Sequence, residues 1–229
     1  MDDFKLSQRS TEKLERSQGG PHFDPQLMAQ SQAAAETGVK SGYFLKRPFD
    51  LVLSGLALVF LSPVFLLIAC LIKFTSPGPV FFRQERLGVN EKPFLILKFR
   101  SMRTGSEKSG SQFTTVNDSR ITPVGKLIRK TSLDELPQLL NVFRGEMSLI
   151  GPRPYIGFEL KDASPSIREM RSSVRPGISG LAQVSGRSTL SQSTVIDFDI
   201  KYVEQCSLWL DFKIVCQTLQ KVVTCDGSN

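Results

Sequence analysis

Two adjacent acids, Asp134 and Glu135, are the residues of this chain whose types and spacing best suit chemistry. They lie in the segment LIRKTSLDELPQLLNVFRGEMSLIGPRP, Leu127 to Pro154. One carboxylate of such a pair can attack phosphorus. The other can hold Mg²⁺, which offsets the phosphate charge that repels an anionic nucleophile. The pair therefore suits phosphoryl transfer to a carboxylate.

The same acids also suit a structural role. Ser132 and Glu135 have the spacing of a capping box, and acids stabilise the positive end of a helix dipole. Pro137 fits better if Asp134 is the N-cap and Glu135 the first helical residue, because proline is tolerated in a first turn. Spacing alone favours capping over catalysis.

Arginines near glycine- and proline-rich turns change that comparison. Such turns expose backbone N–H groups, and an arginine fork matches phosphate oxygens bidentately. Each arginine alone is more often a surface or ion-pair residue, so the grouping carries the interpretation. The arginines are Arg129, Arg144, Arg153, Arg175 and Arg187.

Other catalytic chemistries have little support in the sequence. The only histidine, His22, lies in a polar N-terminal arm, which argues against histidine catalysis and histidine metal sites. The four cysteines form no C-x-x-C pair, so neither a zinc site nor a disulfide framework is indicated.

The acids must be positioned by a domain that follows an uncharged run, Leu51 to Ile72. A straight helix of that length would be roughly 33 Å long, enough to cross a bilayer core. Pro63 lies at its middle and should bend it, and Ser62 can bond a carbonyl that the proline leaves free. Basic residues flank both ends, whereas a simple span should show a bias toward one side.

This pattern favours a helix that enters the membrane, breaks at Ser62 and Pro63, and returns to the same face. A plain transmembrane helix with a tolerated proline is the alternative. Just before the run, Arg47 and Asp50 are three residues apart and are predicted to pair at the membrane surface. Ordinary interface anchoring by Lys46 and Arg47 is the competing interpretation.

The rest of the chain predicts a helix-rich α+β domain. Residues 80–84 and 94–99 are expected to form a hairpin joined by residues 88–92, and residues 103–119 a loop. The segments 145–154 and 175–187 are expected to be irregular. In the last helix one apolar face could be core or lie against the bilayer, and core is favoured. The helices are expected at residues 124–129, 136–143, 164–173, 195–203 and 208–223.

The charge distribution fits a phosphorylated or anionic partner. The formal net charge is +7; five Lys/Arg against six Asp/Glu through Leu45 give −1 there, so the rest carries +8. A basic domain beside a bilayer indicates anionic headgroups or phosphorylated substrates. No nucleic-acid module is recognisable, so nucleic acid is not expected as a partner.

The chain resembles the bacterial sugar transferases, monotopic polyprenyl-phosphate phosphoglycosyl transferases, from Lys46 to about Val223. The resemblance rests on KRPFD, the apolar run with its central Ser62-Pro63, SPGPVFFRQERLG, LKFRSM, SLDELPQLLNVFRGEMSLIGPRP and VRPGISGLAQVSGR. Together these motifs are specific, although no single one carries the assignment.

The resemblance implies transfer of a sugar-1-phosphate from a UDP-sugar to undecaprenyl phosphate, with release of UMP, at the start of exopolysaccharide, capsule or O-antigen synthesis. It makes Asp134 the nucleophile of a covalent phosphosugar intermediate and Glu135 the Mg²⁺ ligand. It makes the apolar run a re-entrant helix. Substrate or phosphate binding falls to Arg129, Arg153, Arg175 and Arg187.

The expected organisation is a disordered arm over residues 1–42, a re-entrant membrane helix over 43–74 and a catalytic domain over 75–229. The expected location is the cytoplasmic face of a bacterial inner membrane, in contact with membrane lipid. A homo-oligomer is possible, and the sugar is left open. The rivals are a non-catalytic module that binds anionic lipid or glycan-assembly partners, and a transferase without a covalent intermediate.

Overall fold

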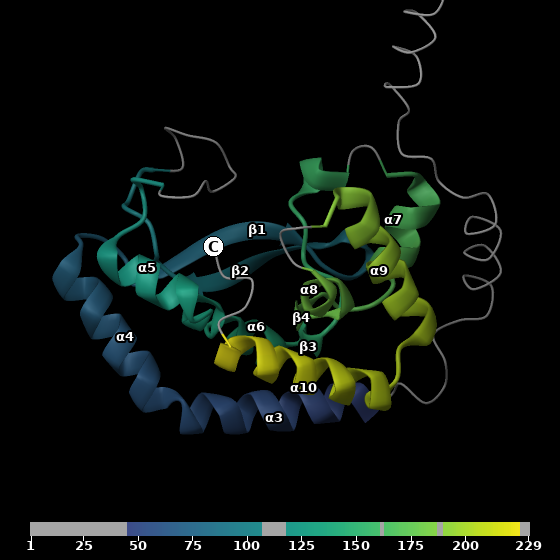
Figure 1. The fold of residues 1–229 in the computed structure, drawn as a ribbon, viewed down its shortest axis with the longest axis horizontal. Coiled ribbons are helices and arrows are strands. Elements are labelled where there is room, and N and C mark those ends of the chain that lie inside the picture. The colour runs from purple at the N-terminus through teal and green to yellow at the C-terminus, as the bar shows by residue number, and fades with distance from the viewer. Residues whose placement is uncertain (1–44, 107–117, 161–162, 187–189, 225–229) are drawn as a thin grey trace, which may run out of the picture. The chain divides into compact units, whose positions relative to one another are not determined.

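The computed structural model describes residues 45–106, 118–160, 163–186 and 190–224 (Figure 1). They form a helix-rich α+β fold, as the sequence predicts. The predicted arm, residues 1–42, lies outside the described residues, as does most of the predicted loop at 103–119. The elements are α3 (Lys46–Phe60), α4 (Ser62–Thr75), β1 (Phe81–Leu87), η2 (Val89–Glu91), β2 (Pro93–Phe99), α5 (Pro123–Lys130), η3 (Leu133–Glu135), α6 (Gln138–Arg144), β3 (Ser148–Ile150), η4 (Gly157–Leu160), α7 (Pro165–Ser172), β4 (Gly177–Ser179), α8 (Leu181–Ser185), α9 (Gln192–Gln205) and α10 (Leu208–Thr224).

The apolar run forms two helices, α3 and α4, that meet at Leu61 with a bend of 60°. Pro63 cannot donate to the carbonyl of Val59, four residues back. The Ser62 hydroxyl donates to that carbonyl instead, at 2.8 Å. Among the described residues no single helix is long and apolar enough to cross a bilayer, whereas the bent pair meets that requirement by length and composition.

Strands β1 and β2 form the predicted antiparallel hairpin, in a register that runs from Phe81 opposite Phe99 to Leu87 opposite Pro93. The connection η2 contains two residues with positive φ, Asn90 and Glu91. Arg168 of α7 binds both carboxylate oxygens of Glu91 at 2.8 Å. The far end of the hairpin is thereby tied to the C-terminal half of the domain.

Helix α6 lies against β2 through one buried amide. Asn141 accepts a hydrogen bond from the Leu97 N–H at 3.0 Å and donates to the Leu95 carbonyl at 2.8 Å. The side chain thus bonds backbone groups of β2 as a neighbouring strand would. This contact sets the position of α6 along the strand.

The segments predicted to be irregular contain regular structure. Residues 145–154 include β3, and residues 175–187 include β4 and α8. β3 and β4 pair in parallel, with Ser148 opposite Gly177. A Cβ on Gly177 would lie 2.1 Å from the Gly151 nitrogen, so glycine permits the close approach. Three-residue strands are too short to give a periodic sequence pattern, which is why they were missed.

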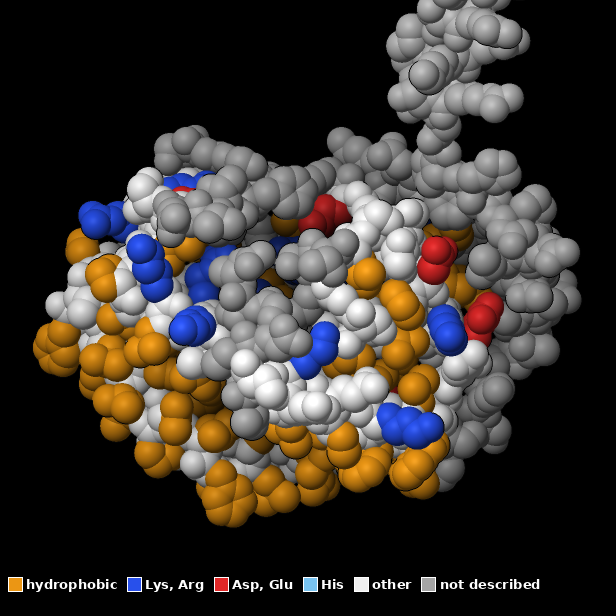
Figure 2. All heavy atoms as spheres, in the orientation of Figure 1, with side chains coloured by type: hydrophobic (Ala, Val, Ile, Leu, Met, Phe, Trp, Pro, Cys, Tyr) orange, Lys and Arg blue, Asp and Glu red, His pale blue; other side chains and the backbone are white. Residues whose placement is uncertain are grey.

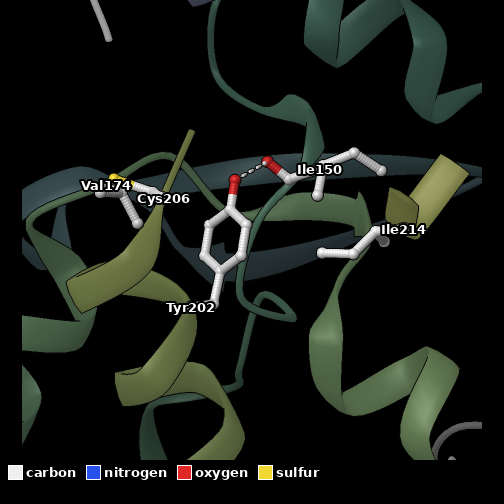
Figure 3. Packing of buried hydrophobic residues seen from close by; sticks show 5 residues of the cluster. All are labelled: Ile150, Val174, Tyr202, Cys206 and Ile214. Atoms are coloured by element: carbon white, nitrogen blue, oxygen red, sulfur yellow. Dashed lines mark hydrogen bonds between the residues drawn. The ribbon is translucent and has the colours of Figure 1, made fainter. Parts of the chain in front are cut away.

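Among the described residues the largest fully buried side chain is Tyr202 of α9, which packs in one core cluster with Ile150 of β3, Val174, Cys206 and Ile214 (Figure 3). Its hydroxyl lies 3.1 Å from the Ile150 carbonyl oxygen and 2.7 Å from Asp211 Oδ1 of α10. Lys46 of α3 binds Asp211 Oδ2 at 2.7 Å. This network joins the start of α3 to β3, α9 and α10, and Figure 1 shows α10 running beside α3.

Candidate active site

Asp134 and Glu135 lie in the short 3-10 helix η3, between α5 and α6. Neither capping interpretation holds. Ser132 has a left-handed φ of 57° and makes no side-chain cap bond, and α6 begins after Pro137, also without a side-chain cap bond. The chain turns at Ser132 and leaves α5 before the acids, so the acids do not cap α6, and a backbone hydrogen bond within Asp134 lowers the pKa of its carboxyl.

The acids are fixed by the leucines on either side of them. Leu133 and Leu136 pack against a cluster formed by Ile68 and Ile72 of α4, with Phe99 of β2 and Ile128 of α5. The acid pair therefore sits on the same apolar cluster as the base of α4.

Asp134 is half-buried, and this burial is the main cause of a pKa raised to about 6. The neighbouring Glu135 charge raises the pKa further, whereas Lys98 and Arg129 lower it. Asp134 is thus near two cations and one anion. A carboxylate with a pKa near 6 is mostly ionised at neutral pH, and it is more basic than an ordinary aspartate.

Glu135 is held by Lys98 of β2, whose Nζ lies 2.7 Å from Glu135 Oε1. Both side chains are partly exposed. The contact fixes the orientation of Glu135 from the hairpin, an element remote in sequence.

Two adjacent carboxylates fit a Mg²⁺ ion bound by one or two acids with substrate phosphates and water completing its shell. Within the described residues, no group of three Asp, Glu, His or Cys side chains gathers at one point. Among the described residues Glu135 would be the ligand of this ion, and Asp134 lies beside it.

The charge of Glu135 also acts on Arg86 of β1. Burial lowers its pKa; the charges of Glu159 and Glu135 raise it, and that of Arg153 lowers it. Its Nη1 donates to the Pro154 carbonyl at 3.1 Å, and its Nε is buried with no bonding partner. Its Nη1 also lies 3.4 Å from Glu159 Oε2, and its Nη2 donates to Gln84 Oε1 at 2.8 Å. Arg86 therefore binds the turn that carries Arg153, and Glu135 acts on it through its charge.

Arg153 is exposed on that turn, and a buried ion pair supports the turn from behind. Arg171 binds Asp199 at 2.8 Å, donates to the Arg153 carbonyl, and stacks 4.0 Å from the centre of the Tyr155 ring. Burial, followed by the Asp199 charge, raises the pKa of Tyr155 to about 12, so its hydroxyl stays protonated.

The predicted arginines thus occupy different places. Arg129 lies near Asp134, and Arg153 lies near Arg86. Arg175 is exposed and donates to the Gly145 carbonyl at 2.9 Å, beyond the end of α6. Arg187 lies outside the described residues.

The predicted pair of Arg47 and Asp50 is replaced by separate partners. Arg47 donates to the carbonyls of Val142 and Phe143 at 2.6 and 2.8 Å, at the C-terminal end of α6. Asp50 accepts from the Leu149 N–H at 3.2 Å and lies 3.9 Å from Lys46. The physical reason is that α3 packs on α6 and β3, whose backbone groups offer closer partners.

Lys98 and Arg86 were missed from the sequence, although both stand in motifs singled out there, LKFRSM and SPGPVFFRQERLG. An alternating strand gives no sign of which charged residue turns toward a distant acid. Together the site offers a basic carboxylate, an oriented second carboxylate and two cations near Asp134, Lys98 and Arg129, which suits attack on a phosphate.

The chain matches the family model described as bacterial sugar transferase over residues 41–225. It is 40% identical over 231 residues to the exopolysaccharide production protein ExoY of Rhizobium meliloti (strain 1021), with 93% of this chain and 97% of that protein covered.

Two longer relatives carry enzyme names. The chain is 45% identical over 190 residues to the UDP-N-acetylgalactosamine-undecaprenyl-phosphate N-acetylgalactosaminephosphotransferase of Aeromonas hydrophila, covering 81% of this chain and 45% of that protein. It is 43% identical over 184 residues to the UDP-glucose:undecaprenyl-phosphate glucose-1-phosphate transferase of Escherichia coli (strain K12), covering 77% and 40%.

Proposed function

This chain belongs to the bacterial sugar transferase family, and from that premise we propose that it transfers a sugar-1-phosphate from a UDP-sugar to undecaprenyl phosphate and releases UMP. Such a transfer would begin the synthesis of an exopolysaccharide, capsule or O-antigen. The observation that carries the proposal is the half-buried Asp134 beside Glu135, which Lys98 orients. Relatives of similar identity name different sugars, so the sugar is left to measurement.

The proposed chemistry has two steps. A carboxylate oxygen of Asp134 attacks the β-phosphorus of the UDP-sugar, the bond from that phosphorus to the bridging oxygen breaks, and UMP leaves with the bond's electrons. An oxygen of undecaprenyl phosphate then attacks the same phosphorus and releases the Asp134 carboxylate. A raised pKa suits the first step, because a more basic carboxylate is a better nucleophile provided that it is ionised.

Cations around the acids would bind the phosphates. Arg129 and Lys98 already lower the pKa of Asp134, so they stabilise negative charge where the phosphate would sit. We assign the exposed Arg153 and its neighbour Arg86, on which the Glu135 charge acts, to the diphosphate. Mg²⁺ at Glu135 would supply further charge neutralisation. Arg175 and Arg187 are proposed as outer phosphate-binding residues.

We place the enzyme on the cytoplasmic face of a bacterial inner membrane, with α3 and α4 as the two arms of a re-entrant helix. The proposed division of the chain is the arm at 1–42, the membrane helix at 43–74 and the catalytic domain at 75–229. Figure 2 supports this placement, because exposed apolar side chains gather along the edge where α3, α4 and α10 lie. The large apolar residues on α3 and α4 that reach the surface include Val52, Leu56, Val59, Phe60, Leu66, Leu67 and Phe74.

Helix α10 has three distinct faces, which is the arrangement expected at a bilayer surface. Asp211 and Ile214 face the core. An outward face carries Trp209, Phe212 and Leu219, which are 64%, 56% and 60% exposed. The remaining outward face is polar, and we propose that it faces water: Lys213, Gln217, Gln220 and Thr224. The sequence favoured core for the apolar face, but in the monomer part of that face is uncovered, which supports contact with lipid.

The test is release of UMP by detergent-solubilised protein with Mg²⁺ and a panel of UDP-sugars, with and without undecaprenyl phosphate. We expect a lipid-independent burst, stoichiometric with enzyme, that Asp134→Asn abolishes and the matched exposed change Asp197→Asn leaves intact. Release only with lipid would favour direct attack by the lipid. No release from folded protein under any condition would favour the non-catalytic module.

A further inference from the structure

Arg100 is a buried arginine that the proposed chemistry does not use. It follows the last residue of β2, and only 5% of it is exposed. Its Nη2 donates to the Ser76 carbonyl and hydroxyl, each at 2.7 Å, and its Nη1 donates to the Pro77 carbonyl at 2.9 Å. Ser76 is the C-cap of α4, so the guanidinium binds the carbonyl end of the second membrane arm, where the helix dipole is negative.

The turn after α4 is shaped to receive this side chain. Gly78 has a φ of +118°, and a Cβ placed on it would lie 2.2 Å from Arg100 Nη1. Thr104 supplies a further acceptor at 3.3 Å. The backbone N–H of Arg100 donates to the Val80 carbonyl at 2.9 Å. Arg100 therefore bonds the segment after α4 with both its main chain and its side chain.

The same strand carries Lys98, two residues before Arg100, and Lys98 binds Glu135. One continuous stretch of backbone therefore holds the end of α4 through Arg100 and the acid pair through Lys98. The apolar cluster holds α4 against the acid segment through Ile68 and Ile72, and the Arg100 contact adds the alignment of the end of α4.

We propose that Arg100 is a positioning residue that fixes the acid pair relative to the membrane arm, so that Asp134 meets the phosphate of the lipid substrate. This inference rests on the proposed function. The two substrates differ in their approach: a UDP-sugar arrives from water and meets the acids within the domain, whereas a lipid phosphate is held in the headgroup plane. Only the second encounter depends on how the acids lie relative to α4.

Removal of the guanidinium should leave the domain folded. Ile68 and Ile72 of α4 stay packed against Phe99 and Ile128, and this apolar contact does not involve Arg100. The change expected is a loss of alignment at the end of α4, where the carbonyls of Ser76 and Pro77 would lose their donor. Misplacement of about 1 Å can cost about a hundredfold in rate.

The experiment measures the two half-reactions separately in Arg100→Met, with the exposed Arg103→Met as a matched control. The UMP burst without lipid gives the first half-reaction. Transfer of labelled sugar-phosphate from loaded enzyme to undecaprenyl phosphate in mixed micelles gives the second. We expect a burst rate within about twofold of wild type. Transfer to lipid should fall by at least about tenfold, and Arg103→Met should change neither rate.

Two further variants approach the contact differently. Arg100→Lys keeps the charge but loses the planar fork that spans Ser76 and Pro77, so it should restore only part of the transfer rate. Gly78→Ala introduces the clash from the opposite side and should reproduce the loss of transfer with the burst retained.

An equal loss of burst and transfer in both Arg100→Met and Gly78→Ala would overturn the proposal, because it would mean a general effect on the domain. Unchanged transfer in both variants would also overturn it. The wild-type burst separates these results from failure of the proposed function: if wild type gives no burst, the covalent chemistry is wrong, whatever the variants do.

Discussion

The raised pKa of Asp134 predicts the pH dependence of the first half-reaction. Only the ionised carboxylate can attack phosphorus, so the rate should follow the ionised fraction of this group. Because the pKa is raised from 3.8 to about 6, the loss of activity on acidification should begin near neutral pH and not near pH 4.

The size of the effect follows from these two pKa values. At pH 5 a group of pKa about 6 is about 9% ionised, so the rate should be about a tenth of its plateau. With the ordinary pKa of aspartate about 94% would be ionised, and the rate would hardly change. The two cases differ about tenfold at a single pH.

The assay is the second-order rate constant of the UMP burst, obtained from the burst rate against UDP-sugar concentration without lipid between pH 4.5 and 8.5, because at low substrate this constant reports the free enzyme. Omitting the lipid removes the titration of its phosphate from the profile. Circular dichroism at each pH shows whether the protein stays folded.

The variant Lys98→Met tests the direction in which the Lys98 charge shifts the pKa of Asp134. The Lys98 charge lowers the pKa of Asp134, so its removal should move the acid limb to higher pH, whereas the exposed Lys92→Met should leave the limb in place. An acid limb near pH 4 in wild type, or a downward shift in Lys98→Met, would refute the reasoning.

Three further predictions concern stability and the membrane. Above pH 6 the raised pKa of Asp134 destabilises the folded state. Asp134→Asn should therefore stabilise the protein by at most about 3 kcal/mol at pH 8, and should give no gain at pH 3, which lies below both pKa values. Guanidinium unfolding in detergent measures the gain at each pH, and equal gains at both would contradict the prediction. Tyr202→Phe should lower the free energy of unfolding by about 1–3 kcal/mol, because Asp211 and the Ile150 carbonyl lose a buried donor; an unchanged midpoint and slope would count against it. Trp209, the only tryptophan, should be quenched in nanodiscs by lipids brominated near the headgroup more than by aqueous iodide; the reverse order would place α10 in water.

The sequence determined the features that depend on neighbours along the chain. The hairpin of β1 and β2, the helices around η3 and the break at Leu61 follow from alternation, helical spacing and the chemistry of proline, which act within a few residues. The motifs also identified Asp134 and Glu135 as the acids of interest. Family membership then followed from many such local patterns together.

The tertiary structure decided which partner each charged residue takes. Lys98 holds Glu135, Arg47 turns to the end of α6, and Arg100 binds the end of α4, all across gaps in sequence that no spacing rule spans. It also decided that the acids do not cap α6, because Ser132 adopts a left-handed conformation and the chain turns before them. Burial of Asp134 has the same origin: its pKa depends on leucines that pack against α4, and that contact exists only when the chain is folded.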